Sequence, residues 1–221
     1  MRKIITTTFL TLDGVMQAPG GPEEDPTNGF RWGGWSFHYF DETMGNVMNE
    51  FMNRPFELLL GRRTYEIFAA HWPFVKNDPV ADQFNRTRKY VVSHRPMQLT
   101  WQNSTLVTGD VAAELINLKQ QNGDDLWVHG SGKLIQTLLA NHLVDRLYVW
   151  TFPVTVGEGK RLFSEGTQPE GLRLVDAKVS TTGVIIASYE PVGDLVTGSF
   201  ALEQPTETEL ERRKRLAKEK G

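Results

Sequence analysis

The chain of 221 residues contains no cysteine, and this absence excludes several classes of protein at once. Without thiols there is no structural disulfide, no cysteine-ligated zinc or iron–sulfur site and no thiol nucleophile. The sequence contains five histidines, at positions 38, 71, 94, 129 and 142. They are scattered and form no His-x-x-x-His pair, so no metal site is predicted.

Long apolar runs and an excess of basic charge are also missing. No stretch approaches the roughly 18 apolar residues of a membrane span, and the N-terminus lacks the apolar core of a signal peptide. The net charge of −3 is opposite in sign to the basic excess of general nucleic-acid binders. We therefore expect a cytoplasmic protein that binds neither membranes nor nucleic acids.

What is present is an alternation of short apolar runs with segments of helical periodicity. Strands are predicted at 4–10, 56–60, 89–93, 105–107, 126–128 and 145–152, and helices at 41–52, 62–70, 111–121 and 133–140. A closing hairpin is predicted from 172–180 and 184–190, around Thr182-Gly183. This pattern predicts an α/β protein with a mixed, mostly parallel central sheet, helices on both faces and a C-terminal antiparallel hairpin.

The length and composition favour one domain over residues 1–192, followed by a charged tail over 193–221. The tail contains the run ETELERRKRLAKEK and is predicted to be a mobile or solvated helix, with an oligomer contact as an open alternative. The loop at 18–34 exceeds ordinary connections, and long loops in compact domains are often lids or binding loops.

Three glycine-rich or basic junctions follow predicted strands, and each suits an anion. They are Gly61-Arg62-Arg63-Thr64, Ser93-His94-Arg95 and Gly130-Ser131-Gly132-Lys133. Taken singly, each also fits an ordinary helix start, polar turn or tight strand–helix packing. Because parallel strands end at one edge of a sheet, the three together indicate a phosphate-binding edge, with the middle one suited to the 2′-phosphate of NADP.

Several segments, in this order along the chain, resemble the dihydrofolate reductase superfamily: GRRTYE (61–66), KYVVSHRP (89–96) and WVHGSGKLIQTLLANHLVDRLYVWTFPVTVGEGKRLF (127–163). TLDG (11–14) and the strand, proline and glycine loop of 144–163 are most similar to the branch that contains the reductase domain of riboflavin biosynthesis. The resemblance covers roughly residues 2–190. It implies a three-layer fold, NADPH as hydride donor, a small-molecule substrate and a homodimer.

The resemblance also assigns roles to residues. It implies that 61–64 hold the dinucleotide phosphates, 93–95 the adenosine phosphate and 130–133 the pyrophosphate. It implies that Asp13 orients or protonates the substrate, although a turn-forming Asp-Gly is the alternative. Trp32, Trp35 and His38 are candidates to cover the substrate ring, and loop anchoring is the other interpretation.

The chain departs from the resemblance in three places. It has no cysteine-containing deaminase domain, so only the reduction step is implied. Gly45 stands near the position where folate enzymes carry a carboxylate, with Asp41 and Glu42 about a turn earlier, and Ser131 replaces the second of two glycines. The implied activity resembles 5-amino-6-(5-phosphoribosylamino)uracil reductase. The alternatives are reduction of a pterin, dihydrofolate-like or other small carbonyl substrate, or a non-catalytic nucleotide-binding relative.

Overall fold

The computed structural model describes residues 1–163 and 165–219, and its centre is one eight-stranded sheet in the order β4-β3-β2-β5-β1-β6-β8-β7. The strands are β1 (Ile4–Thr11), β2 (Phe56–Gly61), β3 (Lys89–Val92), β4 (Ser104–Val107), β5 (Asp125–His129), β6 (Arg146–Phe152), β7 (Gly171–Val179) and β8 (Ile185–Gly193). The first six strands in the sheet order pair in parallel. β8 is antiparallel to β6 and to β7, which confirms the predicted hairpin.

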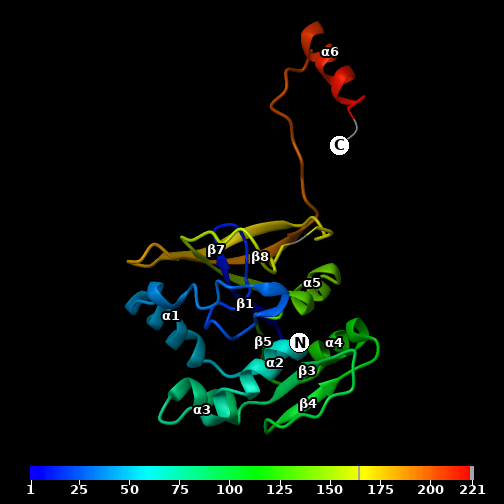
Figure 1. Cartoon of the computed structure of the whole chain (residues 1–221). Coiled ribbons are helices and arrows are strands. Elements are labelled where there is room, and N and C mark those ends of the chain that lie inside the picture. Colours follow the sequence, from blue (N-terminus) through cyan, green and yellow to red (C-terminus); the bar gives the residue numbers. More distant parts are fainter. Residues whose placement is uncertain (164, 220–221) are drawn as a thin grey trace.

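Helices cover both faces of this sheet, as predicted (Figure 1). The α-helices are α1 (Glu42–Met52), α2 (Arg62–Ala69), α3 (Pro79–Arg86), α4 (Val111–Gln120), α5 (Gly132–Ala140) and α6 (Glu207–Leu216). The 3-10 turns are η1 (Thr27–Gly29), η2 (Phe37–Tyr39) and η3 (Trp72–Phe74). One hydrophobic core lies under α4 and α5, and a second, more aromatic core lies under α1, α2 and α3.

The period-two alternation of strand side chains separates the two cores. On β5, Leu126 and Val128 belong to the core under α4 and α5, whereas Trp127 belongs to the aromatic core on the other face. His129 continues this alternation, because its ring contacts those of Phe84 and Trp127. The carboxyl end of β5 therefore presents an imidazole to the aromatic face.

α3 is the helix that the sequence pattern missed. Its eight residues, PVADQFNR, do place Ala81 and Phe84 on one face, but two apolar positions in so short a segment are a weak helical signal. The helix forms because the Asp78 carboxylate accepts hydrogen bonds from the N–H groups of Val80 and Ala81, and because Phe84 packs into the aromatic core. Asp41 caps α1 in a similar way, since its carboxylate accepts from Met44 N.

The tail contains the predicted helix, α6, which is capped by the hydroxyl of Thr206. No residue of α6 is buried, and the helix lies apart from the sheet and its covering layers (Figure 1). No helix in the described residues is both long and apolar enough to span a membrane.

Candidate functional site

The carboxyl ends of the six parallel strands lie along one edge of the sheet, and the predicted site residues follow them. Asp13 lies just beyond β1, the glycine at position 61 ends β2, and the turn at 93–95 follows β3. The turn at 130–132 connects β5 to α5. The register β1–β5–β2–β3 thus brings together segments that are far apart in sequence.

Two of the three predicted junctions are in direct contact. The N–H of Gly61 donates to the Ser131 hydroxyl at 3.0 Å, and that hydroxyl donates to Thr64 Oγ1 at 2.9 Å. A Cβ at position 61 would lie 3.4 Å from the Ser131 side chain, in ordinary van der Waals contact with it. The starts of α2 and α5 are therefore joined by one serine.

These two helices differ from the others in how they begin. Of the six α-helices in the described part of the chain, α1, α3, α4 and α6 are capped by an aspartate or threonine side chain. α2 and α5 begin at Gly61 and Ser131 with no side-chain cap and no acidic residue in the first turn. Uncapped first-turn N–H groups and the positive end of the helix dipole together suit an anion.

The turn before α5 has an unusual backbone conformation. Gly130 and Ser131 both lie in the left-handed region, with φ of 55° and 59°. Serine rarely adopts this conformation, and here its hydroxyl bonds compensate for the strain. Met16 also reaches the turn, because a Cβ at Gly132 would lie 2.7 Å from its sulfur atom.

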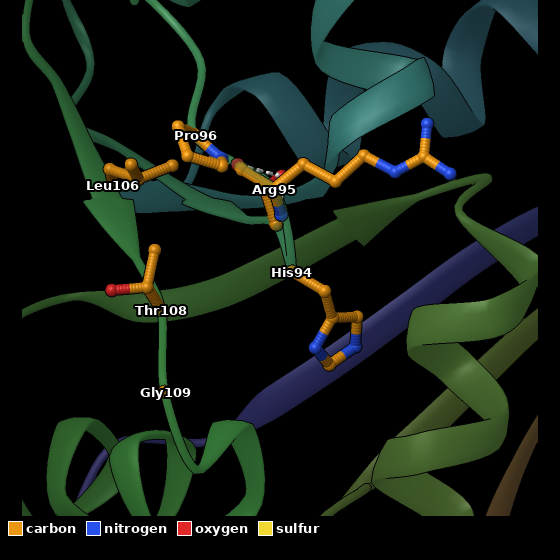
Figure 2. Close-up of a pocket in the computed structure, with 7 residues that line it drawn as sticks. His94, Arg95, Pro96, Leu106, Thr108 and Gly109 are labelled. Atoms are coloured by element: carbon orange, nitrogen blue, oxygen red, sulfur yellow. Dashed lines mark hydrogen bonds between the residues drawn. The ribbon is translucent and has the colours of Figure 1, made fainter.

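The third junction borders a cavity of about 440 Å³, lined by Ser93, His94, Arg95, Pro96, Leu106, Thr108 and Gly109. The Ser93 hydroxyl is used within the turn: it accepts from Arg95 N at 3.1 Å and donates to Arg95 O at 2.7 Å. His94 and Arg95 are exposed, and Figure 2 shows them leaving the turn in different directions. Ser93 therefore shapes the turn, while its two neighbours are free to bind.

The sequence reasoning missed the part of this cavity that β4 contributes. Leu106 lies on β4, and Thr108 and Gly109 follow it, with Gly109 at a φ of 84°. The Thr-Gly-Asp segment between a strand and a capped helix was the available signal. It is weak, because such a segment is also an ordinary turn.

The basic side chains at the starts of α2 and α5 differ in whether an ion pair already uses their charge. Arg62 is one-third exposed and forms an ion pair with Glu66, one turn along the helix, at 2.8 Å. Arg63 is exposed, and so is Lys133 in the first turn of α5. This distribution leaves positive charge at both helix starts.

Asp13 lies where β1 and the loop after β6 meet. Its carboxylate accepts from Thr11 Oγ1 at 2.6 Å, from Gly157 N at 2.8 Å and from Val156 N at 3.3 Å, and Arg161 lies 3.8 Å away. The hydrogen bond from Thr11, with those from the two N–H groups, lowers the pKa of Asp13 below its ordinary value. Asp13 is therefore ionised at neutral pH, and its carboxylate binds the backbone of the loop after β6 at Val156 and Gly157.

The three candidates for covering the substrate ring lie in different environments. Trp35 donates from its indole nitrogen to Gln17 O at 2.8 Å and packs against Phe152, so it anchors the loop. Trp32 is 47% exposed beside Arg31, and His38 is exposed beside Phe37. The structure does not gather them into one group.

Comparison with known proteins identifies the family. The family model described as the RibD C-terminal domain matches residues 2–187. The chain belongs to this family. It is 28% identical to the Bacillus subtilis (strain 168) protein YyaP over 194 residues, which are 85% of this chain and 94% of that protein. The predicted membership of the riboflavin-type reductase branch is thereby confirmed.

Solved structures share the fold of this RibD C-terminal domain at low sequence identity. Dihydrofolate reductase from Enterococcus faecalis, solved in complex with NADP(H), superposes with a TM-score of 0.55 at 14% identity, covering 86% of this chain and 96% of that one. The diaminohydroxyphosphoribosylaminopyrimidine deaminase/5-amino-6-(5-phosphoribosylamino)uracil reductase from Thermotoga maritima also has a TM-score of 0.55 at 14% identity, covering 86% and 56%. At such identities the likeness shows the fold, and the predicted fold is confirmed.

Proposed function

We propose that this RibD C-terminal domain is an NADPH-dependent reductase that delivers a hydride to a small heterocyclic or sugar-derived substrate. The activity would resemble that of the uracil reductase named for the Thermotoga maritima relative. One observation carries the proposal: the two uncapped helix starts lie together at the sheet edge, joined through Ser131. The NADP(H) bound by the structurally similar Enterococcus faecalis reductase supports the choice of cofactor.

The residues present fit a dinucleotide phosphate. Gly61, Gly130 and Gly132 carry no side chain that would fill the space before the two helix starts. We expect the pyrophosphate to be held by the N–H groups of 62–64 and 131–133, with the adenosine in the cavity beside β4 and the 2′-phosphate at His94 and Arg95. When bound, the dihydronicotinamide supplies the hydride.

The substrate side is proposed to include Asp13. Because hydrogen bonds hold its carboxylate ionised, we expect it to orient the substrate by accepting a hydrogen bond rather than by supplying a proton. Reduction of a pterin would call for a carboxylate reaching the site from α1. The carboxylate of Asp41, which caps α1, instead accepts from the N–H and the hydroxyl of Thr181 at 2.6 and 2.7 Å, which favours the riboflavin-type substrate over the pterin.

The decisive experiment is a titration with NADPH and with NADH, followed by nicotinamide fluorescence. We expect the wild type to bind NADPH more tightly than NADH. Arg95→Ala should weaken NADPH binding by about tenfold and leave NADH binding almost unchanged, because it removes one charge-assisted hydrogen bond to the 2′-phosphate. Arg62→Ala should weaken binding of both nucleotides.

Arg54→Ala is the matched control, since Arg54 is exposed and precedes β2 at the opposite edge of the sheet. It should bind both nucleotides as the wild type does. Failure of the wild type to bind either nucleotide would refute the proposal. Tight NADPH binding without turnover of ribosylaminopyrimidines or small carbonyl compounds would instead support a non-catalytic nucleotide-binding role. A homodimer is proposed by analogy alone.

A further inference from the structure

The hairpin of β7 and β8 differs in charge between its two faces. On one face, Lys178 forms an ion pair with Glu50 of α1, and Glu190 forms one with Arg146 of β6. The opposite face of these two fully described strands has no charged side chain; we call it the hairpin face, and it contains Leu172, Leu174, Ala177, Val179, Ile185 and Ala187. A register shift between Leu174 and Asp176 keeps Leu174 on the same face as Ala177. Such a division is typical of strands that bury one face.

The rest of the chain leaves the hairpin face largely uncovered. The core under α4 and α5 reaches Leu147 and Val149 of β6, but among the described residues it includes none from β7 or β8. On the hairpin face, Leu174 is 53% exposed, Val179 67% and Ile185 47%. Contiguous apolar surface of this kind marks an interaction site.

The C-terminal tail begins beside the hairpin face but does not lie on it. It leaves the end of β8 and runs away from the sheet (Figure 1). The family model matches residues 2–187, which include the whole hairpin face and none of the tail. The uncovered surface is therefore a feature of the domain, and its occupant has to be available to the domain itself.

We infer that the hairpin face binds the same face of a second copy of this chain across a twofold axis. A twofold contact brings each patch against its own copy, which an uncharged apolar face permits because it has no like charges to oppose. Two such faces pack about 10 Å apart with their side chains interdigitated. A lipid surface would instead favour basic side chains around the patch, whereas Arg173 and Lys178 lie on the opposite face.

The size of the hairpin face indicates how tightly two copies bind. Two nine-residue strands and their border with β6 outline roughly 400 Å², at about 3.4 Å per residue and 4.8 Å between strands. Contact between two copies then covers roughly 800 Å², which is small for a specific interface. We therefore expect a dimer that dissociates in the micromolar range.

Sedimentation velocity of the full chain, at concentrations from about 1 to 100 μM, tests this contact. The wild type should shift from a monomer of 25.1 kDa towards a dimer over this range. Leu174→Lys and Val179→Lys should each raise the Kd about tenfold or more, because the contact offers no counter-charge to a buried ammonium group. Asp176→Lys, on the charged face of the same strand, is the matched control and should dimerise as the wild type does.

A single thiol provides a second measurement that needs no disruptive substitution. The chain has no cysteine, so Ala177→Cys contains one reactive group, and it lies on the hairpin face. Its labelling by a maleimide should slow as the protein concentration rises. Asp176→Cys, on the opposite face, should label at the same rate at every concentration.

Four results would overturn the inference. They are a wild type that stays monomeric at the highest concentration, a dimer that survives both lysine substitutions, concentration-independent labelling of Ala177→Cys, and loss of the dimer on truncation after Gly193. The last would assign the contact to the tail, and a monomer that binds phosphatidylcholine vesicles would assign the face to lipid. The inference does not depend on the reductase proposal, and Leu174→Lys should bind NADPH as the wild type does if that proposal holds.

Discussion

At the scale of single residues, Ser131 combines a strained backbone with two useful hydrogen bonds. We expect Ser131→Ala to lower the free energy of unfolding by about 1–3 kcal/mol, because the Gly61 N–H loses its acceptor while the left-handed φ of 59° remains. Ser131→Gly loses the same bonds but relaxes the backbone, so it should be about 1 kcal/mol more stable than Ser131→Ala. Urea unfolding of the two variants measures this difference, and equal stabilities would contradict it.

His129 predicts a particular sensitivity to acid. Its pKa is about 4 in the folded protein and about 6.5 in an unfolded chain, so below pH 6.5 the unfolded state takes up the proton first. As the pH falls from 6.5 to 4, the free energy of unfolding should therefore decrease, by up to about 3 kcal/mol from this group.

Urea unfolding of the wild type and His129→Phe at several pH values tests this sensitivity. The variant should lose less stability than the wild type between pH 6.5 and 4, and parallel curves would argue against the effect. His129→Phe should also be at least as stable as the wild type at pH 7, because the phenyl ring removes a buried nitrogen that has no hydrogen-bond partner among the described residues.

At the scale of elements, the long loop after β1 is anchored rather than free. Gln17, which is 3% exposed, donates to Asp25 O at 2.9 Å and to Thr27 O at 3.0 Å, and it accepts from Lys160 N at 3.0 Å. The Lys160 ammonium group pairs with Asp25. Gln17 thus joins the long loop after β1 to the segment 153–162 that follows β6.

Gln17→Leu should detach these two loops from each other. We expect a loss of about 1–3 kcal/mol in the free energy of unfolding, since a leucine leaves the three backbone partners of the amide unpaired. Hydrogen exchange should rise over residues 18–34 and 153–162, while the amides of β1 and β5 stay protected. Gln121→Leu, an exposed glutamine at the end of α4, is the control and should change neither quantity.

At the scale of the whole molecule, the boundary between domain and tail is a testable prediction. The described tail residues from Gly193 onward are almost all exposed, and α6 buries none of its side chains. We expect truncation after Gly193 to change the free energy of unfolding by less than about 0.5 kcal/mol and to leave NADPH affinity unchanged. A large fall in thermal stability, or a change in oligomeric state by light scattering, would show that the tail contributes a contact.

The sequence alone determined the order of the strands and of every α-helix except α3, the parallel sheet, and the place of the three glycine-rich or basic junctions at its edge. Apolar periodicity and glycine turns are local signals, and parallel strands must end at a common edge. The short polar helix α3 was missed because its formation depends on the packing of Phe84 in the aromatic core.

Only the tertiary structure decided what the individual side chains do. Ser131 joins Gly61 across 70 positions of sequence, and Asp13 closes on Gly157 across 144. The buried, unpartnered nitrogen of His129 arises in the same way, because rings from α2 and α3 enclose a residue on β5. Hydrogen-bond partners and burial depend on which distant segments meet, and no local pattern in the sequence encodes that meeting.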